Sequence, residues 1–213
     1  DLGLLTCQDD FCEDATELFN LLTGYSKQRV FRRLLVAPVN LRDEMLARIA
    51  RETKLHQEHG GGRLIFKMNA IVDPAMIEAL YLASQAGVKI DLLIRGISCL
   101  RPGVAGLSEN IRVISVVGRF LEHARAYYFA NHGEPELYLG SADLMQRNLD
   151  RRVETVFPIL DPAMRQRIID NVLELQLRDN AKARELMPDG RYRYVAGNGK
   201  VIDSQTTLMR SED

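Results

Sequence analysis

The 213-residue sequence predicts an α/β fold, a mixed sheet flanked by helices, on three observations. Strand-like and helix-like segments alternate over the first half of the chain, which is typical of parallel strand pairing. The pairs Asp73-Pro74 and Asp161-Pro162 each supply a helix N-cap followed by proline at the first helical position. Between these two caps, short apolar runs separated by turns predict several consecutive strands.

The first elements follow from apolar spacing and from the residues that end each run. Helical spacing continues through Phe11–Leu22 and stops at Gly24, and Leu34–Val36 has the composition of a short buried strand. Leu41–Leu55 is an amphipathic helix that three glycines end, and Leu64–Met68 is the next strand. These segments predict helix, strand, helix and strand before the first Asp-Pro cap.

The rest of the chain is richer in strands. The remaining expected elements are, in order, a helix over 74–87, strands over 88–94, 111–117, 126–130, 136–139 and 153–160, a helix over 162–179 and a last short helix over 202–208. Tyr127, Tyr128, Phe129 and Tyr138 stand at strand spacing. We therefore expect these aromatic side chains in the core rather than on a surface that stacks bases.

Composition limits the class of protein. With 46% hydrophobic and 27% charged residues, the sequence is typical of a globular domain that buries a core. No apolar run approaches the roughly 20 residues of a membrane-spanning helix. The three cysteines form no Cys-x-x-Cys pair, which favours reduced thiols in a cytoplasmic protein over a disulfide or zinc framework. The formal net charge of −1 gives no sign of a nucleic-acid partner.

The start of the chain predicts a fragment of a longer protein. The chain opens on Asp1 rather than on methionine and enters directly into an apolar stretch. Residues 1–55 have the pattern of the end of a preceding unit, and residues 56–213 contain the α/β unit that follows it. We therefore expect a domain division between residues 55 and 56.

Arginine is concentrated in the middle of the chain. The span from Arg95 to Arg152 has eight arginines and no lysine. The planar guanidinium can bind two phosphate oxygens at once, so an arginine-only span favours phosphate recognition. The alternative is a solvated surface with ion pairs, because acidic residues such as Glu109 and Asp150 occur in the same span.

His123 is flanked by Arg119 and Arg125 just before a predicted strand, and Gly140-Ser141 ends a later strand. A strand that ends in Gly-Ser presents a hydroxyl and backbone amides at the carboxyl edge of a sheet, where ligands bind in open α/β folds. A histidine beside such cations and such a turn is a candidate nucleophile or general acid for phosphoryl transfer. A purely structural histidine is the alternative.

Three motifs resemble the signature of the type-1 polyphosphate kinases: Val117–His123, Tyr138–Asp143 and Arg147–Glu154. Further segments resemble the same family, in the family's order: Asp1–Thr6, Lys67–Asp73, Ile94–Ile97 and Leu100–Gly103. The resemblance implies a phospholipase D-like fold. It also implies that the parent protein transfers the terminal phosphate of ATP to inorganic polyphosphate, and that the reaction runs in both directions.

The resemblance also implies how the chain divides and what it lacks. In this family two C-terminal domains of phospholipase D-like fold enclose a tunnel, and each contributes one histidine. Residues 1–55 then correspond to the tail of the first of these domains and residues 56–213 to the second. The phospho-accepting histidine of the family lies upstream of the stretch with which this chain begins. We therefore expect the isolated chain to be inactive.

The resemblance assigns expected roles to single residues. His123 matches the second histidine of the family, which assists transfer as an acid or by stabilising phosphate charge. Arg95 matches an arginine that contacts the phosphates of ATP. The other expected ATP- or phosphate-binding residues are Arg119, Lys67, Asn69, Ser141, Asp143 and Asn148. Such a wall suits phosphoryl transfer, which needs positioning and the neutralisation of spread negative charge.

The resemblance further implies Mg²⁺ as cofactor, with ATP or ADP and inorganic polyphosphate as substrates. No carboxylate pair of the chain is assigned to the metal. For the full-length protein we expect a homo-oligomer in the cytoplasm, with peripheral membrane association as an additional expectation and without a transmembrane segment or a nucleic-acid partner.

Two other functions are compatible with these residues. One is a phospholipase D-like phosphodiesterase that uses His123 as its nucleophile. Phospholipase D enzymes carry lysine two residues after this histidine, whereas Arg125 stands there in this chain, which favours the kinase. The other is a non-catalytic module that binds polyphosphate.

Overall fold

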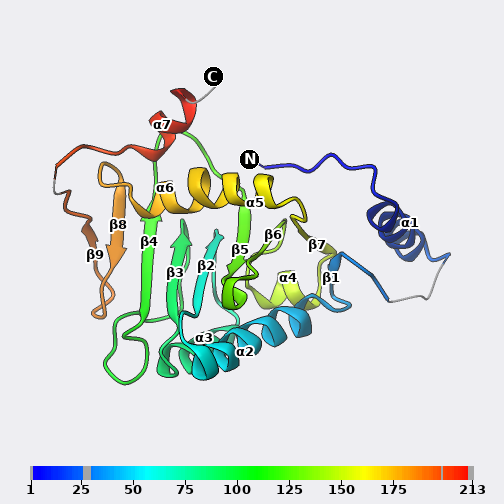
Figure 1. Ribbon diagram of the computed structural model, residues 1–213, viewed down its shortest axis with the longest axis horizontal. Helices are drawn as coiled ribbons and strands as arrows, with labels where there is room; N and C mark the ends of the chain where they lie inside the picture. The colour runs from blue at the N-terminus through cyan, green and yellow to red at the C-terminus, as the bar shows by residue number, and fades with distance from the viewer. Residues whose placement is uncertain (1, 26–29, 198, 211–213) are drawn as a thin grey trace.

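The computed structural model of the chain describes residues 2–25, 30–197 and 199–210; Asp1, which opens one of the motif segments, lies outside them. A nine-stranded sheet in the order β1-β7-β6-β5-β2-β3-β4-β8-β9 forms the centre of the described structure (Figure 1). The strands are β1 (Leu35–Ala37), β2 (Arg63–Met68), β3 (Lys89–Ile94), β4 (Ile111–Val116), β5 (Arg125–Phe129), β6 (Glu136–Gly140), β7 (Glu154–Pro158), β8 (Ala183–Leu186) and β9 (Tyr192–Tyr194). The α-helices are α1 (Asp9–Thr23), α2 (Leu41–His59), α3 (Pro74–Gln85), α4 (Gln146–Asp150), α5 (Pro162–Ile168), α6 (Leu175–Leu177) and α7 (Ser204–Arg210).

The sheet is mixed, as predicted. The central strands β2, β3 and β4 are parallel, with Arg63 opposite Lys89 and Met68 opposite Ile94. The other described strand pairs are antiparallel. The strand–helix–strand pattern over 64–94 therefore does form a parallel unit, in which α3 is the crossover helix.

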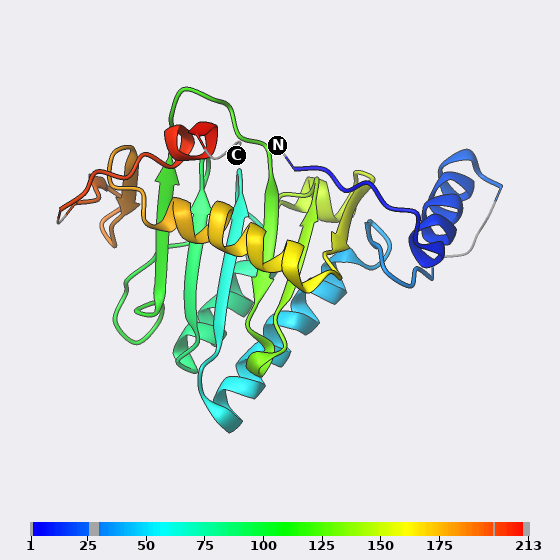
Figure 2. The same cartoon turned by 45° about the horizontal axis from the view of Figure 1, so that its top comes forward.

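Helices cover both faces of the sheet, and the alternation of side chains along each strand separates two cores. Phe66 on one face packs with residues of α2 and α3. Ile65 on the other face packs with the long helix made of α5, the π-helical segment Ile169–Glu174 and α6. Figure 2 shows this long helix in front of the sheet and α2 behind it. Tyr127 and Phe129 lie in the core, as their spacing predicted.

Both Asp-Pro caps are confirmed. The Asp73 carboxylate accepts a hydrogen bond from Met76 N at 3.1 Å, and the Asp161 carboxylate accepts one from Met164 N at 2.7 Å. In each helix proline follows the cap at the first position, where its missing N–H costs nothing. No helix among the described residues is long and apolar enough to cross a membrane.

The structure adds elements that the sequence did not predict. The strands β8 and β9 and the five-residue helix α4 belong to segments without a strong apolar period. The division predicted between residues 55 and 56 falls inside α2. The strand β1, which pairs with β7, precedes that division, and so does most of α2, which packs in the core with Phe66. The assignment of two domains remains a prediction.

Candidate active site

One edge of the sheet collects the predicted site residues. It is the edge where β2, β3, β4 and β6 end and where β5 and β7 begin, because Lys67 lies opposite Ala126 and Arg125 lies opposite Gly140. We call it the site edge; in Figure 1 the arrows of β2, β3 and β4 point to it. The eight predicted residues lie on its strand ends or in the segments next to them: Lys67, Asn69, Arg95, Arg119, His123, Ser141, Asp143 and Asn148.

His123 lies in the segment between β4 and β5, and its side chain is exposed. Its carbonyl oxygen accepts a hydrogen bond from Arg125 Nη1 at 2.6 Å, which ties the backbone of the segment to the start of β5. His123 lines a pocket of about 360 Å³ together with Gly140, Ser141 and the N-terminal residues 2–4. The histidine and the Gly-Ser turn that the sequence paired are therefore brought together in one pocket.

Asp143 connects the end of β2 to the start of β5. Its buried carboxylate accepts hydrogen bonds from Arg125 at 3.2 Å through Nε and Nη2, and from Asn69 N at 2.7 Å. This two-pronged ion pair neutralises the guanidinium of Arg125. The contacts fix the strand ends beside His123, whereas a direct phosphate contact by Asp143 or Asn69 remains a prediction.

Glu154, the first residue of β7, holds two further predicted residues. Its buried carboxylate accepts hydrogen bonds from Ser141 Oγ and from Asn148 Nδ2. Asn148 is buried, and among the described residues its Oδ1 has no hydrogen-bond partner. A buried amide oxygen without a donor is uncommon in folded proteins, so the hydrogen-bonding capacity of Asn148 is not fully used within the described structure.

Lys67 lies in a second polar cluster, on the face of the sheet that the long helix covers. Its Nζ is 2.7 Å from the Glu122 carboxylate, which also accepts hydrogen bonds from Gln176 at 2.5 Å and Gln205 at 2.8 Å. Burial raises the pKa of Glu122, but the Lys67 ammonium and the two amides outweigh burial, so the pKa is lowered. The Lys67 charge is thus matched within the fold, and its predicted contact with phosphate remains a prediction.

Arg95 and Arg119 differ from Arg125 and Lys67 in their charge partners. Arg95 follows β3 and is half-buried, and Arg119 is exposed with its guanidinium over the Phe120 ring at 5.4 Å. Neither side chain forms an ion pair with any described residue, so both guanidinium groups are available to an anion. Among the predicted phosphate-binding residues, Arg95 and Arg119 are therefore the best candidates to bind an anion through a positive charge that no described acidic group neutralises.

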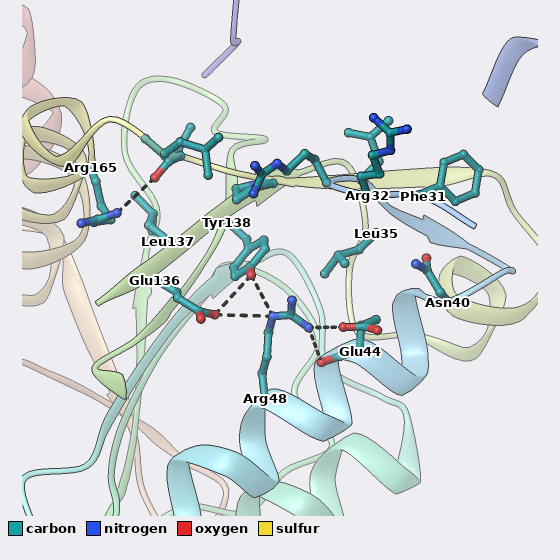
Figure 3. A pocket seen from close by; sticks show the side chains of 15 residues that line it. Phe31, Arg32, Leu35, Asn40, Glu44, Arg48, Glu136, Leu137, Tyr138 and Arg165 are labelled. Atoms are coloured by element: carbon teal, nitrogen blue, oxygen red, sulfur yellow. Dashed lines mark hydrogen bonds and ion pairs between the residues drawn. The ribbon is translucent and has the colours of Figure 1, made fainter. Parts of the chain in front are cut away.

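Another pocket, of about 310 Å³, lies toward the opposite edge of the sheet, where β6 begins and β7 ends, beside β1 and α2. Figure 3 shows Arg48 in this pocket with Glu44, Glu136 and the hydroxyl of Tyr138 around its guanidinium. Because acidic groups already match this arginine, and because none of the eight predicted residues lines the pocket, we place the candidate site at the site edge.

Comparisons with known proteins show the family of the chain. The family model described as polyphosphate kinase C-terminal domain 2 matches residues 34–205. The chain belongs to this family. A curated relative, polyphosphate kinase 1 of Chlorobaculum tepidum, is 54% identical over 210 residues, which are 99% of this chain and 30% of the relative. The polyphosphate kinase of Synechocystis sp. is 57% identical over 90% of this chain and 26% of its own length. The chain thus spans about a third or less of these family members.

Solved structures support the fold of this family member. The polyphosphate kinase of Porphyromonas gingivalis superposes with a TM-score of 0.93 at 41% identity, over 96% of this chain and 32% of that one. The phospholipase D family member Nuc of Salmonella typhimurium superposes with a TM-score of 0.53 at 13% identity, over 73% of this chain and 97% of that one. At this low identity the second likeness shows the phospholipase D-like fold alone.

Several residues that organise the site were not assigned from the sequence. Glu122 and Glu154 fall inside the family motifs, so the motifs could have singled them out as buried charges. Gln176 and Gln205 carry no such signal, because they reach Glu122 from 54 and 83 residues away in the chain. Only the folded structure brings these amides to the site.

Proposed function

We propose that the chain is the C-terminal part of a polyphosphate kinase that transfers the terminal phosphate of ATP reversibly to inorganic polyphosphate. One observation carries this proposal: in a member of the polyphosphate kinase family, His123, Arg95 and Arg119 lie along a single sheet edge, and neither arginine has an acidic partner among the described residues. Such an edge suits phosphoryl transfer, in which catalysis is mostly positioning and stabilisation of negative charge.

In the proposed reaction, an imidazole nitrogen upstream of this chain attacks the γ-phosphorus of ATP, and the bond to the β–γ bridging oxygen breaks. His123 gives a proton or a hydrogen bond to a phosphate oxygen as charge develops, and Arg95 and Arg119 neutralise the phosphates. The terminal oxygen of polyphosphate then attacks the phosphohistidine. The histidine is thereby regenerated, and the polymer is one phosphate longer. The reverse sequence makes ATP from ADP.

Magnesium belongs to the proposal only as a partner of the nucleotide. Within the described residues, no group of three or more His, Cys, Asp or Glu side chains is placed to hold a metal ion. We therefore assign no residue of this chain to Mg²⁺ and route no step through it. Phosphate oxygens of the substrate are common ligands of this ion. The homo-oligomer, the cytoplasmic location and its peripheral membrane association stay expectations for the full-length protein.

The decisive experiment compares full-length wild type with His123→Ala in polyphosphate formation from Mg-ATP. A lost general acid lowers the rate about 10²- to 10⁴-fold, and we expect a loss of that size. His59→Ala is the matched control, because His59 is an exposed histidine near the end of α2, away from the site edge, and stacks on His132. Equal activity of wild type and His123→Ala would remove His123 from the chemistry.

The two alternative functions give different results in the same assays. A diesterase would cleave bis(p-nitrophenyl) phosphate, and this cleavage would depend on His123. A non-catalytic module would bind polyphosphate equally well after His123→Ala and would make no polymer from ATP. The chain alone should make no polymer either, and robust synthesis by residues 1–213 would show that the phosphorylated histidine is wrongly placed upstream.

A further inference from the structure

Two adjoining pockets lie at the β4–β8 end of the site edge. The first, about 460 Å³, is lined by Arg95, Lys182 and Arg184 among others. The second, about 720 Å³, is lined by Arg119, Lys182 and Arg210 among others. Lys182 and Val117 line both, so the two pockets adjoin, and we call them together the basic groove. Figures 1 and 2 both show α7, which carries Arg210, beyond the end of β4.

The basic groove is positively charged, whereas the whole chain has a net charge of −1. Its lining includes five basic side chains and one acidic side chain, Asp203, an excess of four positive charges in a chain of net charge −1. None of the five cations forms an ion pair with a described residue. Asp203 is engaged locally, because its carboxylate accepts a hydrogen bond from Thr206 N at 3.0 Å in the first turn of α7. A concave surface with one sign of charge attracts the opposite sign.

A buried carboxylate fixes two walls of the groove. Asp179, which is inaccessible to solvent, accepts hydrogen bonds from Lys182 N at 2.7 Å and from the neighbouring backbone amides of 181 and 183. Its other oxygen accepts bonds from Ser204 N at 2.8 Å and Ser204 Oγ at 2.7 Å. These bonds lower the pKa of Asp179 although burial raises it. Asp179 thereby holds the backbone of Lys182 against the start of α7.

A buried amide fixes the third wall. Gln205, in the first turn of α7, accepts a hydrogen bond from Phe120 N and donates one to Phe120 O, both at 2.9 Å. The segment that carries Arg119 is thus bound to the same helix as Arg210. A Cβ atom on Gly118 would lie 2.3 Å from Gln205 Oε1, so a larger residue there would displace this amide from Phe120. The walls are preorganised before any ligand arrives, which reduces the entropic cost of binding.

We propose that the basic groove holds the distal part of the polyphosphate chain as it leaves the site edge, with Lys182 and Arg210 as contacts that only a long chain reaches. This inference rests on the proposed function, which supplies the polymer. Five cations, four of them exposed, around two adjoining pockets suit a flexible linear polyanion, because each cation can bind a phosphate without a fixed register. Arg95, at the other end, adjoins the proposed ATP phosphates.

The test uses the full-length protein and the double variant Lys182→Gln with Arg210→Gln. Binding of long-chain polyphosphate and of tripolyphosphate is measured over a range of salt concentrations, without ATP. We expect about tenfold weaker binding of the long chain, with a salt slope lower by about 1.4 for two lost phosphate contacts, at about 0.7 for each contact with a single-stranded polyanion. Tripolyphosphate binding and the KM for ATP should not change, and the polymer made by the variant should be shorter.

The matched control is Lys89→Gln with Arg167→Gln, which removes the same two charges from exposed positions outside the groove. Equal loss in this control, or equal loss of the long and short chains, would overturn the groove as the binding site. Unchanged long-chain binding in the test variant would overturn it too. If wild type makes no polymer but binds long chains through the groove, the proposed function fails and the groove stands. If wild type makes polymer and the test variant binds normally, the groove alone fails.

Discussion

Glu122 connects the fold to the candidate site, because it precedes His123 in the chain and its carboxylate binds groups from three other elements. Lys67 belongs to β2, Gln176 to α6 and Gln205 to α7. The backbone of the His123 segment is therefore fixed by a partly buried ion pair and two amides. A change at Glu122 should reach the site and the stability of the chain together.

Glu122→Gln should lower the free energy of unfolding at pH 7 by about 1–3 kcal/mol, since a charged hydrogen bond is lost. The pKa of Glu122 is lowered below its ordinary 4.5 in the folded chain. Its contribution is therefore complete above the unfolded pKa and disappears as the pH falls through the folded pKa. Urea unfolding at pH 7 and at successively lower pH measures this difference. A gap between wild type and variant that stays constant down to strongly acidic pH would contradict the ion-pair explanation.

At this scale the sequence predicts some of the site and misses the rest for a physical reason. Ser141 could be singled out because it stands at the end of an apolar strand, where chemistry-bearing side chains collect. His123 could be singled out because it lies between Arg119 and Arg125 just before a strand, and the expected role of Arg95 came from the family resemblance. Asp143 neutralises Arg125, whereas Arg95 has no such partner in the part of the chain that the structure describes, and this difference depends on which strand ends become neighbours. No local pattern carries that information, so the arginine-rich span proved to contain both paired and unpaired guanidinium groups.

At the scale of elements, the two Asp-Pro caps share one sequence signature but differ in their surroundings. Asp161 is exposed and caps α5 through Met164 N. Asp73 is buried, caps α3, and also binds Arg42 through two hydrogen bonds of 2.8 and 2.7 Å. Arg42 in turn contacts Asp150 at the end of α4. Asp73 therefore joins the starts of α2 and α3 and the end of α4 as well as capping one helix.

Asp73→Ala should lower the free energy of unfolding by about 2–4 kcal/mol, because it removes a cap and leaves Arg42 without its buried partner. Asp161→Ala should cost only about 1 kcal/mol, the usual value of an exposed cap. Chemical denaturation of the two variants beside wild type measures both losses. Equal losses would mean that the Arg42 contact contributes no net stability.

The elements that the sequence predicted are those with strong apolar periods or clear end signals. The central strands β2, β3 and β4 are nearly continuous apolar runs that both faces of the sheet bury. The residues of β9 are all exposed, and β8 alternates weakly, so their pairing depends on β4 rather than on their own composition. The long helix was predicted as one piece, whereas its π-helical segment between 169 and 174 has no signature in the sequence.

At the scale of the whole molecule, the position of the domain division determines what a truncated chain retains. The family model begins at residue 34, just before β1. Leu35 pairs with Val156 of β7, and Leu41, Met45 and Ile49 of α2 are buried in the core that contains Phe66. These contacts place residues 34–55 with the sheet that follows them. We therefore predict a division before β1 in place of the one between residues 55 and 56.

Truncated chains separate the two divisions. A chain that begins at residue 34 keeps β1 and the whole of α2, so it should retain one cooperative thermal transition. A chain that begins at residue 56 exposes the core face that Leu41, Met45 and Ile49 cover; at about 1.5–3 kcal/mol for each large side chain, it loses roughly 5 kcal/mol or more. That loss is comparable with the whole stability of an ordinary domain, about 5–15 kcal/mol.

Near-UV circular dichroism during heating, together with binding of a hydrophobic dye, distinguishes the two chains. A sharp transition and no dye binding in the chain that begins at residue 56 would restore the division inside α2, because the sheet would then have shown that it needs neither β1 nor the first part of that helix.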